Sequence, residues 1–328
     1  MARKENRYLV LDCETATLPF ADEVAEHDAE KKKKIAIARP LIYDIGWTIT
    51  NRKGELLDRK QFLIAETFSV PSVFNTAYYA EKRPIYLKML ENKQTVIKPW
   101  REVIDIMIND FHAVDAVGAY NSMFDFKKAI PFTDLYINKL YSPDYYNWEN
   151  FQRNMCYRIA NERYQKDPDK EFEADIFRFH GEVFSLFDLW GLSAKYLLNN
   201  VAYKKQCLNN EMLTASGTFF KTSAEASYRY LTEKYDFDEA HTALDDATIE
   251  TYILSKIAKK AAISVGIVFF PFRELGTTDE FVLRKKRPDA KEIEIVINAM
   301  RNYLAGKEPS RYATRLENII DTLAQYLA

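Results

Sequence analysis

The stretch that decides the fold of this chain is Tyr8-Leu9-Val10-Leu11-Asp12-Cys13-Glu14-Thr15. Its first half is a continuous apolar run without a turn residue, which predicts a buried strand. Side chains alternate between the two faces of a strand, so Asp12 and Glu14 share one face at the end of the run. Two like charges side by side repel each other. The stretch therefore fits either a cation site or an exposed strand end.

The composition is ordinary for a globular protein. The chain has 328 residues, enough for one large domain or two smaller ones, and 47% of them are apolar and 29% charged. A net charge of −2 gives no overall attraction to nucleic acid, so such binding would depend on local patches or metal ions. Three scattered cysteines, a charged N-terminus and no long apolar run predict a soluble, intracellular, cytoplasmic protein without membrane contact.

Apolar runs bounded by turn residues predict an α/β fold with a mixed five-stranded sheet flanked by helices. The first three strands are expected to be antiparallel, because Asn51-Arg52-Lys53-Gly54 supplies a hairpin turn between the second and the third. Helices are predicted over residues 77–90 and 100–111, and a last helix is predicted to run to about residue 260. The five strands are predicted at residues 8–13, 41–50, 55–65, 113–120 and 183–189.

Two further polar stretches lie at the ends of these elements. Asn121-Ser122-Met123-Phe124-Asp125 follows the fourth strand, where Asp125 either faces a site or merely starts a helix with Asn121 as its N-cap. His241 lies at the predicted start of the last helix of the sheet domain, and Asp246 lies five positions after it. Asp245 is 100° round that helix from Asp246, so the two cannot both face inward.

These three stretches together resemble the DnaQ-like 3′→5′ exonucleases, the DEDDh branch of the ribonuclease H-like superfamily. The family motif D-x-E-T-x-x-L matches Asp12 to Leu18, N-x-x-F-D matches Asn121 to Asp125, and H-x-x-x-x-D matches His241 to Asp246. The sister branch has a tyrosine where this chain has Thr242, which argues against that branch. The resemblance covers roughly residues 6–260, and nothing matches over residues 261–328.

The resemblance implies the roles of the site residues. Asp12, Glu14, Asp125 and Asp246 would bind two Mg²⁺ or Mn²⁺ ions, since oxygen ligands select hard cations. His241 would be the general base that takes a proton from the attacking water. The expected substrate is the 3′ end of single-stranded nucleic acid, with DNA favoured, and the products are nucleoside 5′-monophosphates. The residues expected to bind the substrate are Thr15, Leu18, Asn121 and Phe124.

The predicted organisation is an exonuclease domain over residues 1–260, with insertions near 19–38 and 132–181, and a C-terminal extension over residues 261–328. The aromatic-rich second insertion fits either a stacking platform for bases or a helical segment packed on the core. Two amphipathic helices in the extension predict a hairpin that contacts a polymerase, another replication or processing partner, or a second copy. The alternatives for the whole chain are an RNA-trimming exoribonuclease of the same fold and an inactive nucleic-acid-binding module.

Overall fold

The computed structural model describes residues 6–17, 40–141, 176–268, 270–285, 290–305 and 311–325. The first insertion, most of the second and the predicted substrate residue Leu18 lie outside this part of the chain. The chain forms two compact units, Met1–Leu275 and Gly276–Ala328. None of the described helices combines the length and the apolar character needed to cross a membrane.

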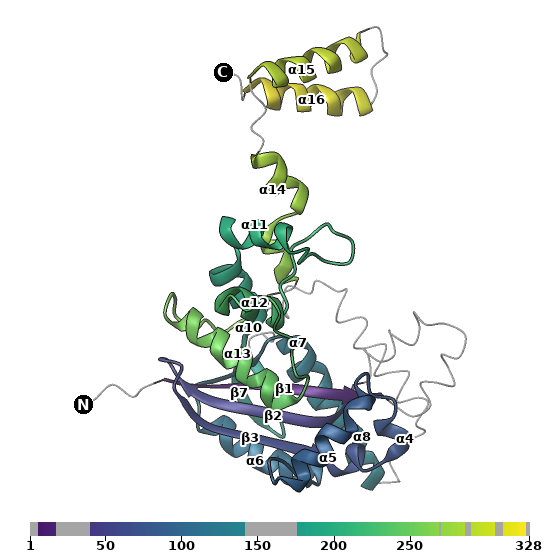
Figure 1. Ribbon diagram of the computed structural model, residues 1–328, viewed down its shortest axis with the longest axis vertical. Helices are drawn as coiled ribbons and strands as arrows, with labels where there is room; N and C mark the ends of the chain where they lie inside the picture. Colours follow the sequence, from purple (N-terminus) through teal and green to yellow (C-terminus); the bar gives the residue numbers. More distant parts are fainter. Residues whose placement is uncertain are drawn as a thin grey trace, which may run out of the picture. The chain divides into compact units, whose positions relative to one another are not determined.

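The first unit is built on a seven-stranded mixed sheet in the order β4-β3-β2-β1-β5-β7-β6 (Figure 1). Strand β1 pairs antiparallel with β2 and parallel with β5, while β5 pairs parallel with β7. Strand β3 pairs antiparallel with β2 and parallel with β4. The strands span β1 Arg7–Ala16, β2 Leu41–Asn51, β3 Leu56–Ile64, β4 Val96–Lys98, β5 Ala116–Ala119, β6 Ile176–Phe179 and β7 Glu182–Asp188.

This sheet confirms the α/β class and the antiparallel start, but the predicted number of five strands is wrong. Strand β4 has three residues, two of them exposed, so it has no apolar run to reveal it. Strand β6 lies within the range interpreted as an insertion. It forms a hairpin with β7 through His180 and Gly181, which both have positive φ angles of 49° and 85°, as a tight two-residue turn requires.

The helices of the first unit cover both faces of the sheet. Leu9 and Leu11 of β1 are buried in one core cluster with residues of α6, and α13 packs across β1 and β2 (Figure 1). The predicted helix over residues 100–111 is confirmed as α6, and the predicted last helix is confirmed as α13, which begins at Ala243 rather than at His241. The helical region predicted from residue 77 begins at Ala80. The longer helices are α5 Arg83–Glu91, α6 Trp100–His112, α8 Ile130–Tyr141, α11 Val201–Asn209, α12 Ala224–Thr232 and α13 Ala243–Ala258.

Short helical turns connect these elements. They comprise α3 Ala65–Phe68, α4 Pro71–Phe74, η1 Ala80–Lys82, α7 Ser122–Phe124, the π-helical turn η2 Asp125–Ala129, α10 Leu189–Ser193, the π-helical turn η4 Ala194–Leu198 and η5 Pro271–Leu275.

The second unit contains α14 Thr278–Lys285, α15 Ala290–Leu304 and α16 Arg311–Gln325. Helices α15 and α16 contact each other, with Ile297 and Ile320 buried between them, so the predicted helical hairpin is present. Several apolar side chains of α15 and α16 remain exposed, including Ile295 at 64% and Tyr303 at 51%. A pair of helices cannot bury more than one apolar stripe each.

Candidate metal centre

The three predicted motifs meet where β1, β5 and α13 come together. Residues paired across antiparallel strands project from the same face of a sheet, and Asp12 pairs with Gly46 of β2. A Cβ atom built on Gly46 would lie 2.5 Å from the backbone nitrogen of Leu244 in α13. Asp12 and Glu14 therefore face the first turn of α13, which carries Asp246. Asp125 begins η2, directly after β5 and α7.

Glu14, His241 and Asp246 lie close enough together that they could hold a metal ion. One ligand atom from each lies within 4.8 Å of the others, although they come from opposite ends of the first unit's sequence. Nδ1 of His241 lies 3.8 Å from Oδ2 of Asp246. The backbone of His241 also forms a hydrogen bond with the Asp246 carboxylate. Asp246 Oδ1 is buried without a hydrogen-bond partner among the described residues.

The candidate carboxylates have pKa values above their usual range. Burial, and then the charges of Glu250, Asp125, Asp246 and Glu14, raise the pKa of Asp12 well above its usual range. Burial raises the pKa of both Asp125 and Asp246 to about 8. Burial followed by the charge of Asp246 likewise raises the pKa of Glu14. Divalent cations would compensate these charges, and an all-oxygen donor set with one imidazole nearby fits Mg²⁺ or Mn²⁺.

Glu250 is a buried acidic residue that the motifs did not reveal. It lies one helical turn after Asp246 in α13, is 4% exposed, and accepts a hydrogen bond of 3.2 Å from the backbone nitrogen of Tyr120. Its charge is the first Coulombic cause of the raised pKa of Asp12. The sequence did contain a signal, because position 250 shares the apolar face of the helix with Ala247 and Leu254.

His241 has an unusual local environment. Its φ angle of 51° is left-handed, and its side chain is 32% exposed. Its ring stacks on Tyr79, with centroids 4.3 Å apart and an angle of 15° between the planes. Burial and then the charge of Lys82 lower the pKa of the imidazole, which keeps the ring neutral at neutral pH. A neutral imidazole is the form that can accept a proton.

Three more of the predicted residues, Thr15, Asn121 and Phe124, are described by the structure. Thr15 is half-buried on β1, just after the register shift between Glu14 and Thr15. Asn121 is exposed and occupies the N-cap position of α7, where its carbonyl oxygen accepts from the backbone nitrogen of Phe124, but its side chain makes no capping hydrogen bond. Phe124 is partly buried against the core. Asp188 is the N-cap of α10, accepts from Gly191, and also accepts from the backbone nitrogen of Ser122 at 3.3 Å, which anchors the turn that leads to Asp125.

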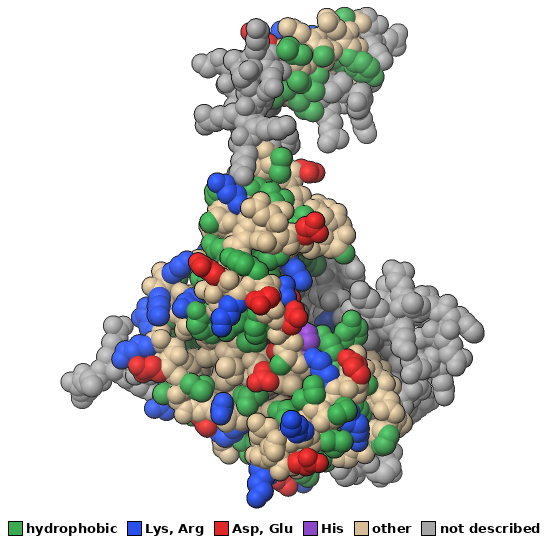
Figure 2. Space-filling view, in the orientation of Figure 1, with side chains coloured by type: hydrophobic (Ala, Val, Ile, Leu, Met, Phe, Trp, Pro, Cys, Tyr) green, Lys and Arg blue, Asp and Glu red, His purple; other side chains and the backbone are tan. Residues whose placement is uncertain are grey.

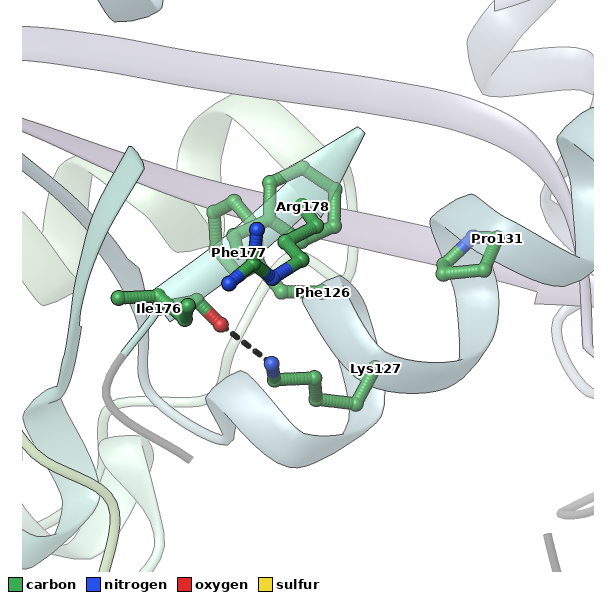
Figure 3. Close-up of a pocket in the computed structure, with 6 residues that line it drawn as sticks. All are labelled: Phe126, Lys127, Pro131, Ile176, Phe177 and Arg178. Carbon is green, nitrogen blue, oxygen red and sulfur yellow. Dashed lines mark hydrogen bonds between the residues drawn. The ribbon is translucent and has the colours of Figure 1, made fainter. Parts of the chain in front are cut away.

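A separate cavity of about 180 Å³ lies beside η2 and β6 (Figure 3). Lys127 crosses it and donates from Nζ to the carbonyl oxygen of Ile176. None of the predicted site residues lines this cavity, so it is not part of the candidate metal centre. Its lining residues are Phe126, Lys127, Pro131, Ile176, Phe177 and Arg178.

Comparison of the chain with models of protein families, with curated proteins and with solved structures finds no match. A functional assignment therefore depends on the three motifs and on the geometry described above.

Proposed function

We propose that the chain is a metal-dependent 3′→5′ exonuclease with a ribonuclease H-like fold, acting on single-stranded nucleic acid. The central strands β3-β2-β1-β5-β7 support this fold, because three antiparallel strands are followed by two parallel ones. The convergence of Glu14, His241 and Asp246 carries the functional part of the proposal. Neighbouring carboxylates that repel one another destabilise the folded chain unless a cation compensates their charges.

In this proposal, Asp12, Glu14, Asp125 and Asp246 hold two Mg²⁺ or Mn²⁺ ions. When bound, such ions stabilise charge on the scissile phosphate and on the leaving 3′ oxygen. His241 accepts the proton of the attacking water, and its lowered pKa suits that role. Thr15, beside the cluster on β1, contacts the terminal nucleotide through its backbone.

The charge distribution suits a short substrate segment rather than a long duplex. On the face drawn in Figure 2, basic and acidic side chains of the described residues are interspersed, without a broad basic area. The net charge of the whole chain is −2. Attraction to phosphates would therefore come mainly from the metal ions and from single cations such as Lys82, which lies near enough to lower the pKa of Glu14.

The test is hydrolysis of 5′-labelled single-stranded DNA and RNA, with a free or a blocked 3′ end, in Mg²⁺ or Mn²⁺. We expect stepwise shortening from a free 3′ end, faster for DNA, and at least a 100-fold loss in Asp12→Ala. Asp105→Ala, which removes an exposed carboxylate from α6, is the matched control and should keep full activity. Faster shortening of RNA would favour the exoribonuclease alternative. Binding without shortening of either polymer would favour the inactive binding module and refute the proposal.

A further inference from the structure

We propose that Tyr79 is a positioning residue for His241, an inference that rests on the proposed function. Tyr79 belongs to none of the three motifs and precedes η1, in the segment between α4 and α6. Its ring lies nearly parallel to the imidazole, at 15°, with the ring centroids 4.3 Å apart. Stacking between aromatic rings is favourable beyond the area that it buries. The stack therefore fixes the plane of the ring that accepts the proton.

The surroundings of His241 explain why its ring depends on this contact. The residue lies outside any helix or strand and has a left-handed backbone. Nδ1 faces Asp246 Oδ2 at 3.8 Å and Glu239 Oε2 at 3.9 Å. Both distances exceed a hydrogen bond, so neither carboxylate orients the imidazole firmly. Among the described residues, the contact that can hold the plane of the imidazole is the stack on Tyr79.

The same segment also holds the backbone of the His241 loop. Lys82 of η1 donates from Nζ to the carbonyl oxygen of Ala240 at 2.5 Å, and Nζ lies 4.6 Å from the centroid of the Tyr79 ring. Tyr86 of α5 donates from its hydroxyl to the carbonyl oxygen of His241 at 3.4 Å. Tyr86 is fully buried and packs edge-on against Tyr43 and Phe68, so this support is rigid.

This arrangement assigns a role to residues 79–86 that packing alone does not require. Packing alone would not require the ring of Tyr79 to lie parallel to the imidazole of His241. Nor would it require Lys82 to donate to the carbonyl oxygen of Ala240. Proton transfer depends strongly on geometry, because the base must lie within hydrogen-bonding reach of the water it deprotonates. The stack thus acts on the rate of the chemical step and leaves the affinity for the oligonucleotide nearly unchanged.

The first measurement uses nuclear magnetic resonance to detect the contact between the rings of Tyr79 and His241, and it needs no catalytic turnover. The chain has four histidines, and the ring signals of His241 are identified as those missing from the spectrum of His241→Asn. A stacked tyrosine shifts the ring protons of His241 upfield. We expect Tyr79→Leu to abolish this shift and Tyr79→Phe, which keeps the ring, to preserve it. An unchanged His241 signal in Tyr79→Leu would overturn the inference.

The second measurement is the single-turnover rate on a 5′-labelled oligonucleotide, with the enzyme in excess. Tyr79→Leu should lower this rate about 3- to 10-fold, with less than a two-fold change in oligonucleotide affinity, and Tyr79→Phe should restore it. In a His241→Ala background, Tyr79→Leu should have no further effect. Tyr235→Leu, which removes an exposed tyrosine, is the matched control.

An unchanged rate in Tyr79→Leu, or an equal loss with and without His241, would overturn the positioning role. If the wild-type protein hydrolyses neither DNA nor RNA, the proposed function fails, and the ring spectrum alone decides whether Tyr79 holds His241.

Discussion

Asp44 offers a measurable link between the sheet and the first turn of α13. It is fully buried on β2, opposite Glu14, and one carboxylate oxygen accepts a 2.9 Å hydrogen bond from the backbone nitrogen of Ala243. Nε2 of Gln61 lies 3.0 Å from both carboxylate oxygens, whereas Oε1 of Gln61 is buried without a partner. The substitution Asp44→Asn keeps the acceptor for Ala243, and its new amide can donate to Oε1 of Gln61 after that side chain flips.

The structure gives both the size and the sign of the expected effect. Burial raises the pKa of Asp44 from 3.8 to about 6, and a difference of this size corresponds to about 3 kcal/mol. The folded protein therefore binds this proton more tightly than the unfolded chain does. The contribution of Asp44 is unchanged below about pH 4, falls between about pH 4 and 6, and stays lower above that range. The variant Asp44→Asn does not lose stability in this way, because the Asn side chain does not ionise.

The assay is urea unfolding of the metal-free wild-type protein and Asp44→Asn between pH 4 and 8. At pH 4 the two free energies of unfolding should agree within about 1 kcal/mol, and by pH 7 the variant should be more stable by up to about 3 kcal/mol. Asp105→Asn, which removes an exposed carboxylate from α6, controls for the loss of one charge. A stability difference that does not change with pH, or a variant less stable than the wild type at pH 8, would refute the reasoning.

Three further predictions concern other parts of the chain. Gly46→Ala places a Cβ atom 2.5–2.7 Å from the backbone of Ala243 and Leu244, so α13 must move outward. We expect a loss of about 1–3 kcal/mol in unfolding free energy. We also expect at least a 10-fold loss in the rate of hydrolysis. Mg²⁺ or Mn²⁺ at about 100 times its dissociation constant should stabilise the protein by about 2.7 kcal/mol at pH 8. Calorimetry should show a smaller stabilisation by the metal ion at pH 5, because Asp246, with a pKa of about 8, holds a proton there. Self-association through α15 and α16 predicts that Ile295→Lys, at a position 64% exposed, lowers the sedimentation coefficient, and an unchanged value would argue against it.

The sequence predicted those parts of the fold whose signal is local. The apolar run Leu9–Leu11 and the turn at Asn51–Gly54 define β1, β2 and β3, because strand alternation and turn chemistry act between neighbours along the chain. Strand β4 was missed because it is held in the sheet by pairing with β3 rather than by burial of apolar side chains. Strand β7 was predicted, but its partner β6 was missed because the surrounding aromatic residues indicated an insertion.

The same distinction separates the site residues that sequence reasoning found from those it missed. Asp12, Glu14 and Asp246 are recognisable because each belongs to a short motif. Asp44 and Glu250 were missed because they are distinguished by their burial rather than by a motif. The available signal was an acidic residue inside an apolar run for Asp44, and one on the apolar face of a helix for Glu250. Tyr79 gave no such signal, because a tyrosine in a helical region is ordinarily a packing residue. Its position against His241 depends on a contact between distant segments, which only the folded chain brings together. The motifs thus contain the groups proposed to carry out the chemistry, while Tyr79, proposed to orient one of them, lies outside the motifs.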